Sequence, residues 1–589
     1  MSNKKTNIIA TFLLIFMAII TISSVAGDSV TMDESSHLPA GYSYIYKADM
    51  RINPEHPPLM KDLAGLPLLF IKGVNFPEQS KSWNQEINGQ WEFGSDFLYR
   101  SGNNPDKMIF WGRMPMIAIL LLLGFYVFMW AKELFGNNIA LLSLFLYGFS
   151  PTLLAHGRLV TTDVAAAAGA FISTYYFVKF LNNPSKKNIV LSGIFFGLAE
   201  LLKYSLILLV PFFGLVVIIF SFSKSNNFKD FLKTFWFYFI KSVLIGLIGF
   251  ILIYIVYLYH VWNYPLEKQL SDTKFILTSF KTRPLADLTS LLAGIPIFRP
   301  IAQYLLGLFM VLQRASGGNT SYFMGEISAA GWKNYFPMVY LIKETLSFHI
   351  LLLFSLLFGI WSLFKKPFWQ NTIFRTKKWL KEHLAEFSMF LFVIIYWATS
   401  LSSNLNIGVR HLLPVFPFTI VLVAFAILTF VNKGQYSNYK RIVLAFLLIW
   451  QAVSVLLVFP HFLAYFNEIA GGAKNGYKFA VDSNLDWGQD LRRLSDWTNE
   501  KNIDKIYVDY FGGGNTEYYL KNKFLPWWGS RNPNEMPKGS YLAVSATFLQ
   551  GGRGKSAPNF DQPTGYYNWL NNYTPVARIG FSIFVYRID

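Results

Sequence analysis

The chain has 589 residues, of which 53% are apolar and 15% are charged, whereas a soluble domain carries roughly 25% charged residues. With 57 Phe, 32 Tyr and 17 Trp, this composition excludes a disordered chain, a collagen and an ordinary cytosolic enzyme, and it indicates a polytopic membrane protein. The net charge of +18 is interpreted first as a signal of membrane topology, so no nucleic-acid partner is expected, and the absence of cysteine excludes disulfides, thiolate metal sites and a cysteine nucleophile.

Apolar runs long enough to cross a membrane recur along the chain. A hydrocarbon core of about 30 Å needs about 20 helical residues, and on this basis the sequence predicts eleven transmembrane helices. Spans five and six are separated only near Lys203 and Tyr204, so whether they are separate is left open. The predicted spans cover residues 8–26, 109–131, 138–155, 163–181, 189–203, 205–222, 238–259, 345–364, 387–401, 412–431 and 442–460.

The first apolar run admits a second interpretation. Lys4 and Lys5 precede it and Ser24-Val25-Ala26 resembles a cleavage site, as in a secretory signal peptide. The run from Ile8 to Ala26 is longer than the apolar core of a usual signal peptide, which favours a retained helix.

Basic residues in short loops set the orientation, because cytoplasmic loops are enriched in Lys and Arg. With the N-terminus in the cytoplasm, most short-loop basic residues fall there, among them Lys365 and Lys366. Three long segments, 27–108, 260–344 and 461–589, then lie outside. We therefore expect a multi-pass protein of a plasma membrane, a bacterial inner membrane, with an extracytoplasmic C-terminal domain.

The last 130 residues differ from the rest of the chain. Asp490–Asn502 has the pattern of an amphipathic helix, and three short runs have the pattern of strands. This pattern predicts a small α/β domain over 461–589 after a membrane domain over 1–460. The strand candidates are Ile506–Tyr510, Tyr541–Phe548 and Phe581–Ile588.

Two adjacent carboxylates, Asp33 and Glu34, follow the first span directly. At a membrane surface such a pair can supply a general base and a partner that orients it. His37 lies four residues beyond Asp33 and would share its face in a helix, although Pro39 argues against a regular helix here. The alternative is that Asp33 only caps a helix.

A proline-rich stretch, Asn53-Pro54-Glu55-His56-Pro57-Pro58, is the second unusual feature. Pro58 suits the first turn of a helix, which would hold His56 beside a helix N-terminus where amide groups favour an anion. The alternative is a rigid turn with a solvated His56.

Further charged residues fall at the predicted outer ends of spans. Each of them alone is explained by an interfacial anchor that reaches the lipid headgroups. Together they place cations near two carboxylates, and guanidinium and ammonium groups are the usual ligands of phosphate, so the set suits a lipid phosphate whose tail stays in the bilayer. These residues are Arg113, Arg158, Asp163, Lys203, Arg410 and His411.

Two motifs in the last segment are weak. Gly512–Gly514 follows a strand candidate but lacks the spacing of a phosphate-binding loop, so a turn is expected. Asp482, Asp486 and Asp490 resemble a calcium loop, but Arg493 stands where its last carboxylate belongs, so capping and turn roles are expected.

In chain order these motifs resemble the membrane glycosyltransferases of the GT-C fold, and within them glycosyltransferase family 39, which includes protein O-mannosyltransferases and lipid A aminoarabinose transferases. The resemblance covers about residues 1–460. It is carried by the Asp-Glu pair after span one, the His-Pro-Pro, the Arg that opens span two, the Arg-x-x-x-x-Asp turn, the Gly-Leu-Ala-x-x-x-Lys helix end and the late Arg-His-x-x-Pro. It implies a GT-C fold with about eleven transmembrane helices and an inverting transfer of a sugar from a polyprenyl-phosphate donor to an acceptor on the extracytoplasmic face.

The resemblance also implies roles for individual residues. Asp33 would accept the proton of the attacking hydroxyl, with Glu34 as its catalytic neighbour. No cofactor is expected, and a divalent metal is not excluded. Donor phosphate would be bound by Arg113, Lys203, Arg410 and His411, and the sugar or acceptor pocket would be formed by His37, His56, Arg158 and Asp163.

Other interpretations remain open. The long luminal trefoil insert of eukaryotic O-mannosyltransferases is missing, so the acceptor could be a lipid, a glycan or a protein. A multi-pass transporter or lipid flippase would use the same charges as a path, but transporters usually contain internal repeats and broken helices at the midplane, and neither is found here. A third hypothesis is a binding or assembly protein whose outer tail, 461–589, is the working part.

Overall fold

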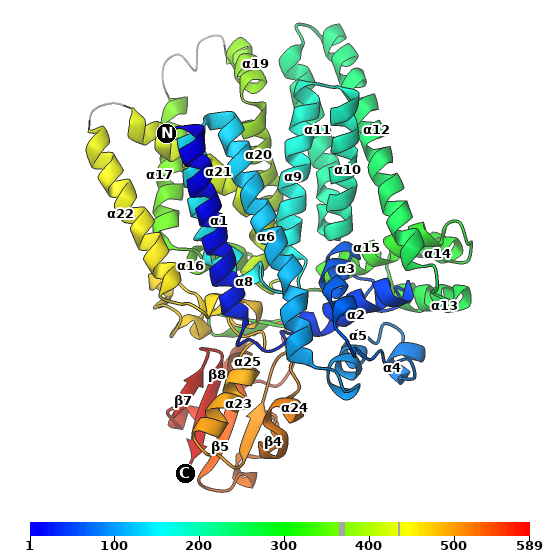
Figure 1. The fold of residues 1–589 in the computed structure, drawn as a ribbon, viewed down its shortest axis with the longest axis vertical. Coiled ribbons are helices and arrows are strands. Elements are labelled where there is room, and N and C mark those ends of the chain that lie inside the picture. Colours follow the sequence, from blue (N-terminus) through cyan, green and yellow to red (C-terminus); the bar gives the residue numbers. More distant parts are fainter. Residues whose placement is uncertain (365–371, 434–435) are drawn as a thin grey trace.

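The computed structural model describes residues 1–364, 372–433 and 436–589. Lys365 and Lys366, counted above among the cytoplasmic basic residues, lie outside the described residues. A bundle of long helices forms most of the protein, and a small sheet-containing region extends from one end of it (Figure 1). The protein is therefore a multi-pass α-helical membrane protein, as the composition predicts.

Helices occur at all eleven predicted span positions, but they differ in length. Among the described residues, eight are long and apolar enough to cross a membrane, or nine if the pair α16 (Tyr335–Lys343) and α17 (Leu346–Leu363), bent by 118°, counts as one span. The two shorter helices, α7 (Asn137–Gly148) and α10 (Lys186–Leu202), have 12 and 17 residues. The eight are α1 (Asn3–Val25), α6 (Pro105–Phe135), α9 (Asp163–Asn182), η3 with α11 (Tyr204–Lys224), α12 (Phe228–His260), α20 (Leu384–Leu401), η5 with α21 (Val409–Asn432) and α22 (Ser437–Leu456).

Spans five and six are separate elements. α10 ends at Leu202, Lys203 is extended with φ −160°, and η3 begins at Tyr204. Gly193 and Gly197 bring α10 against α12, because a Cβ on Gly197 would lie 2.8 Å from the carbonyl oxygen of Gly249. Close helix packing through small residues in this way is common in membranes, and it fixes the end of α10 that carries Lys203.

The three long segments gather at one end of the bundle, while the N-terminus lies at the other end (Figure 1). Which side of the membrane this end faces stays a prediction. The segments contribute α2 (Glu34–Lys47), α3 (Leu59–Gly65), α4 (Lys81–Asn84) and α5 (Gln90–Ser95), then α13 (Leu266–Ile276), α14 (Arg283–Ala293) and α15 (Arg299–Gly317), and finally the sheet region.

α2 contradicts the expectation that Pro39 opposes a regular helix, because Pro39 lies inside it. Proline removes one N–H donor and leaves the carbonyl four residues earlier, that of Ser35, without its helical partner. Gly94 of α5 packs onto this carbonyl, and a Cβ there would lie 1.9 Å from the Ser35 oxygen. The missing Cβ of Gly94 therefore lets α5 pack closely against α2 at the turn that contains the proline.

The last segment has the predicted α/β character. A five-stranded sheet has the order β4-β3-β5-β8-β7, with β3 parallel to β4 and β5 and with β8 antiparallel to β5 and β7. The domain boundary at residue 460 stays a prediction. The elements are α23 (Leu491–Glu500), β3 (Ile506–Asp509), α24 (Thr516–Leu520), β4 (Phe524–Pro526), β5 (Ser540–Ser545), α25 (Ala546–Arg553), β7 (Ala577–Ile579) and β8 (Ile583–Ile588).

Candidate active site

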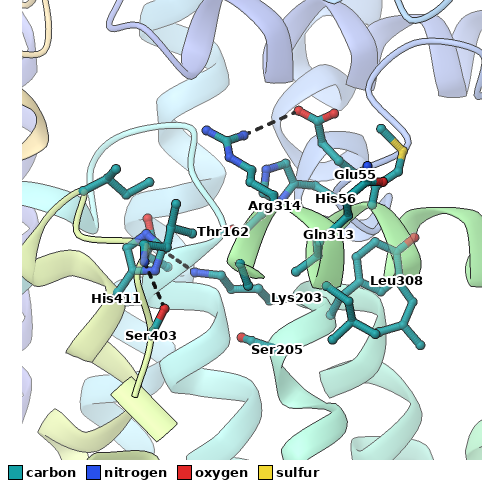
Figure 2. A pocket seen from close by; sticks show the side chains of 18 of the residues that line it. Glu55, His56, Thr162, Lys203, Ser205, Leu308, Gln313, Arg314, Ser403 and His411 are labelled. Carbon is teal, nitrogen blue, oxygen red and sulfur yellow. Dashed lines mark hydrogen bonds and ion pairs between the residues drawn. The ribbon is translucent and has the colours of Figure 1, made fainter. Parts of the chain in front are cut away.

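A cavity of about 1050 Å³ opens at the end of the bundle where the long segments gather. Its walls come from parts of the chain that are far apart in sequence, including α2, α9, η3, α15 and η5. Figure 2 shows Lys203 and His411 on one side and Glu55 and Arg314 on the other. Seven of the ten predicted site residues line this cavity, namely Asp33, His37, His56, Asp163, Lys203, Arg410 and His411.

Four charged residues of the cavity, Asp33, Arg410, Asp163 and Lys203, form one chain of ion pairs. Arg410 Nη1 lies 2.6 Å from Asp33 Oδ2 and 3.3 Å from Asp163 Oδ2. Lys203 Nζ lies 2.5 Å from Asp163 Oδ1. Asp163 therefore fixes both cations, and Asp33, whose side chain is 22% exposed against 2% for that of Asp163, is the carboxylate open to the cavity.

Asp33 stands at the N-cap position of α2, as the capping alternative requires. Within the described part of the chain, however, its side chain makes no capping hydrogen bond and is paired with Arg410 instead. Because helix α2 begins at the next residue, the N-cap position sets the direction in which the Asp33 carboxylate points. The geometry thus favours a role in the cavity over a role as a helix cap.

Glu34 and Arg113 form a fully buried pair beside the cavity rather than lining it. Arg113 Nε and Nη2 donate to the two oxygens of Glu34 at 2.8 Å and 2.6 Å, and these oxygens also accept from the backbone N–H groups of Val160 and Thr31. Burial alone would raise the pKa of Glu34, but Arg113 holds it below its ordinary value. Arg113 is therefore not among the residues that line the cavity, and its guanidinium is bonded to Glu34 and to nearby carbonyls, so its expected role at the donor phosphate stays a prediction.

Arg158 is also buried away from the cavity. Its Nη1 lies 2.5 Å from Asp28 Oδ2 and 2.9 Å from the carbonyl oxygen of Ser24. Asp28 was not singled out by the sequence, although it too follows the first span. Arg158 thus secures the chain just before Asp33. It does not line the cavity, so the expectation that it shapes the sugar pocket stays a prediction.

Two of the three predicted histidines, His37 and His56, lie together on the cavity wall. The rings of His37 and His56 meet edge to face at 4.9 Å, and His37 Nδ1 lies 3.0 Å from the carbonyl oxygen of Val160. Burial lowers the pKa of both, and that of His56 falls well below its ordinary value. Both rings are therefore neutral near pH 7 and can donate or accept hydrogen bonds with a polar ligand.

Lys61, which donates hydrogen bonds to two residues of the cavity wall, was missed by sequence reasoning. Its ammonium is fully buried, and among the described residues its four hydrogen bonds go to neutral oxygens, of which those of Tyr44, Asn53 and His56 lie at 2.7–2.8 Å. It thereby holds the proline-rich stretch that carries His56 against the cavity. The signal for it was a Lys beside Asp62 in the largely apolar run after Pro58.

The burial of Lys61 predicts a pH dependence of stability. Burial lowers its pKa to about 7, although Asp62 and Glu55 oppose the shift, whereas an unfolded chain has a value of about 10.4. Between these values the unfolded chain binds more protons, so the Lys61 contribution to stability rises from pH 7 towards pH 10. In thermal unfolding between pH 7 and pH 9 we expect the parent protein to gain stability relative to Lys61→Met, while parallel curves for the two proteins would contradict this assignment.

The same cavity has a second ion pair and many apolar lining residues. Arg314 Nη1 lies 3.9 Å from Glu55 Oε1 (Figure 2). A cavity lined by both charged and apolar side chains fits an amphipathic ligand. The apolar lining includes Ile207, Leu208 and Pro211 after the break at Lys203, and Leu308, Val311 and Leu312 on α15.

Metal ligands were considered for the same region. Across residues 1–364, 372–433 and 436–589, no three His, Asp or Glu side chains are grouped so that they could hold a metal ion. Whether the protein depends on a metal stays open.

Comparisons with known proteins bear on this site. No curated protein matches the sequence. Among solved structures, ArnT from Cupriavidus metallidurans bound to undecaprenyl phosphate is 12% identical, with 98% of this chain and 97% of that chain covered at a TM-score of 0.44. The archaeal oligosaccharyltransferase AglB from Archaeoglobus fulgidus, in complex with an inhibitory peptide and a dolichol-phosphate, is 13% identical, with 91% and 69% covered at a TM-score of 0.43.

The family model of dolichyl-phosphate-mannose-protein mannosyltransferases matches residues 106–255. This stretch holds Arg113, Arg158, Asp163 and Lys203, four of the residues that carry the resemblance stated from the sequence. The chain is thus a multi-pass membrane protein whose resemblance to the GT-C glycosyltransferases of family 39 is confirmed over residues 106–255.

Proposed function

We propose that the protein transfers a sugar from a polyprenyl-phosphate donor to an acceptor hydroxyl, with Asp33 as the general base. The observation that carries this proposal is a cavity in which Asp33 lies beside Arg410, Asp163 and Lys203 and whose other lining residues are largely apolar. A lipid-linked sugar has the same division into a charged head and an apolar tail. The family match over residues 106–255 supports a glycosyltransferase independently of this geometry.

The reaction follows from the placement of the charges. The acceptor oxygen attacks the anomeric carbon, its proton passes to the Asp33 carboxylate, and the bond between the sugar and the phosphate oxygen breaks with its electrons on the phosphate. Arg410 and Lys203 stabilise the charge that grows on this phosphate. A single displacement of this kind inverts the anomeric centre.

The cations are held in place before the substrate arrives. Asp163 pairs with both Arg410 and Lys203, so both cations have a protein partner that holds them when no ligand is bound. Preorganised groups of this kind stabilise a transition state without the cost of reorganisation, and removing one such donor typically lowers the rate about 10²–10³-fold. His37 and His56, neutral and on the same wall, would bind sugar hydroxyls.

The face of the membrane and the acceptor belong to the proposal as well. We place the cavity on the extracytoplasmic side of a plasma membrane, because the short loops at the opposite end of the bundle carry the excess of basic residues. The acceptor is a lipid, a glycan or a protein.

The test of the function is a reconstitution of the purified protein in vesicles with a panel of polyprenyl-phosphate sugars. We expect mass spectrometry to show release of the polyprenyl phosphate and gain of the sugar mass on an acceptor supplied with membrane extract. Robust movement of the lipid across the bilayer without transfer products would contradict the proposal and favour the flippase hypothesis.

Lys203 gives a second prediction, concerning donor affinity. Because a hydrogen bond to a charged group contributes about 1.5–3 kcal/mol, Lys203→Gln should weaken the binding of undecaprenyl phosphate about 10- to 100-fold. Titration by native mass spectrometry measures this, with the exposed Lys501→Gln as the control and the polyprenol without phosphate as the comparison ligand. Unchanged affinity in Lys203→Gln would place the phosphate elsewhere.

A further inference from the structure

Arg410 stacks on Trp487, an aromatic residue of the C-terminal region. The guanidinium carbon of Arg410 lies 4.2 Å from the centre of the Trp487 ring, and Trp487 is 1% exposed. A cation over an aromatic face is held most firmly where water is excluded. Trp487 therefore restrains the same guanidinium that pairs with Asp33 and Asp163.

The chain around Trp487 also holds the residues that precede Asp33. Met32 N–H donates to the carbonyl oxygen of Trp487 at 3.0 Å, and Ser29 N–H donates to that of Gln489 at 2.9 Å. Ser29 Oγ donates to the carbonyl oxygen of Gly488 at 2.8 Å and accepts from Leu491 N–H at 3.1 Å. The segment 29–32 is thus bound along its length by residues more than 450 positions later in the chain.

The glycine run at 512–514 has a part in this contact. A Cβ on Gly513 would lie 2.2 Å from the Thr31 carbonyl oxygen and 2.9 Å from Ser35 Cβ. Gly488, with φ +95°, would place a Cβ 2.4 Å from the Gly512 Cα. These glycines allow two backbone segments of the C-terminal region to reach the chain on either side of Asp33, which explains a motif that the sequence suggested only as a turn.

Ion pairs also link the membrane bundle to the C-terminal region. Asp28 is buried between two arginines, with Oδ2 2.5 Å from Arg158 Nη1 and Oδ1 2.7 Å from Arg493 Nη2. Burial would raise the pKa of Asp28, but the arginines hold it below its ordinary value. One of these arginines belongs to the membrane bundle and the other to α23, so the ionised Asp28 links the two.

We infer that the C-terminal region contributes to the active site, and that Trp487 and Gly513 are positioning residues that hold Arg410 and Asp33 in place relative to each other. This inference rests on the proposed function and extends it to residues that touch neither donor nor acceptor. It excludes the hypothesis that the tail works alone, since the groups it positions belong to the membrane bundle.

The first test compares Trp487→Leu, which removes the aromatic face, with Trp487→Phe, which retains one. We expect kcat for sugar transfer to fall about 10- to 30-fold in Trp487→Leu, with the donor KM within about threefold, because the lost restraint acts on the charge that grows in the transition state. Trp487→Phe should keep at least about a third of kcat. A kcat within twofold of the parent in Trp487→Leu, or an equal loss in both variants, would overturn the inference, provided that gel filtration and thermal unfolding show folded protein.

The second test does not depend on activity. Because the chain has no cysteine, Ser36→Cys places a single thiol on the cavity wall three residues after Asp33. Ser36 is 1% exposed, so a polar maleimide should react slowly with this thiol, and adding Gly513→Ala should raise the labelling rate at least about tenfold. The matched control is Gly551→Ala in α25, where the nearest atom to a new Cβ is 3.9 Å away, and it should leave the rate unchanged.

The two tests separate the inference from the proposed function. Faster labelling in Gly513→Ala, together with no sugar transfer by any protein including the parent, would reject the proposed function. It would still support the inference that the C-terminal region holds the segment around Asp33 in place. Sugar transfer by the parent, together with unchanged labelling in Gly513→Ala and unchanged kcat in Trp487→Leu, would reject the inference and leave the proposed function standing.

Discussion

Asp33→Asn is expected to lower kcat for sugar transfer about 10²–10⁴-fold, which is the contribution of a positioned general base. The amide has nearly the shape of the carboxylate and its oxygen can still accept the hydrogen bond from Arg410, but it cannot take the proton of the attacking hydroxyl. Donor binding should therefore change by less than about threefold. Initial rates at saturating donor measure the effect.

The control for this variant is Asp504→Asn, which changes an exposed carboxylate of the C-terminal region. It should transfer sugar at the parent rate. Undiminished transfer by a folded Asp33→Asn protein would reject Asp33 as the base, whereas a loss that appears only as a raised KM would assign it to substrate binding.

Arg113→Met is expected to destabilise the protein by about 3–5 kcal/mol, because it leaves the Glu34 carboxylate buried without its counter-charge. Both side chains are 0% exposed, so water cannot replace the lost partner. Unfolding in mixed micelles measures the change, and the yield of folded protein should fall with it.

The double variant Glu34→Gln/Arg113→Met should recover part of this loss, since it removes the buried charge as well. Recovery should be incomplete because Glu34 also accepts hydrogen bonds from the N–H groups of Thr31 and Val160, which a single amide oxygen cannot both satisfy in the same way. A double-mutant cycle in which the two changes add within about 0.5 kcal/mol would contradict a coupled pair.

The sequence predicts the helical membrane fold, the C-terminal strands and the convergence of Asp33, Lys203 and Arg410. These predictions rest on the length of apolar runs and on the charges at the outer ends of spans. Together these two features determine how deep in the membrane each residue lies. Residues at one depth can meet, so the prediction of a shared cavity follows from topology.

Depth does not reveal which way a side chain points around its helix. Arg113 and Arg158 lie at the expected end of the bundle, but they turn to Glu34 and Asp28 and not to the cavity. Uniformly apolar spans give no periodicity from which this orientation could be read. The role of Trp487 was equally hidden, because only the folded chain places it against Arg410, 77 positions earlier.

The lengths of individual spans also could not be predicted from the sequence pattern. The apolar run at 138–155 is interrupted at Ser150 and Pro151, where α7 has ended and the short helix α8 (Pro151–His156) begins. Proline and a capping Ser at this point start a new helix within an apolar stretch. Hydropathy does not distinguish such a break from a continuous span.

The most direct test of the account is a structure of the protein with a bound polyprenyl-phosphate lipid. The account predicts phosphate density within hydrogen-bonding distance of Lys203 and Arg410, with the lipid tail along Leu208 and Leu308 and with Asp33 facing the open side of the phosphate. Phosphate density outside this cavity, or a tail that leaves in another direction, would contradict it.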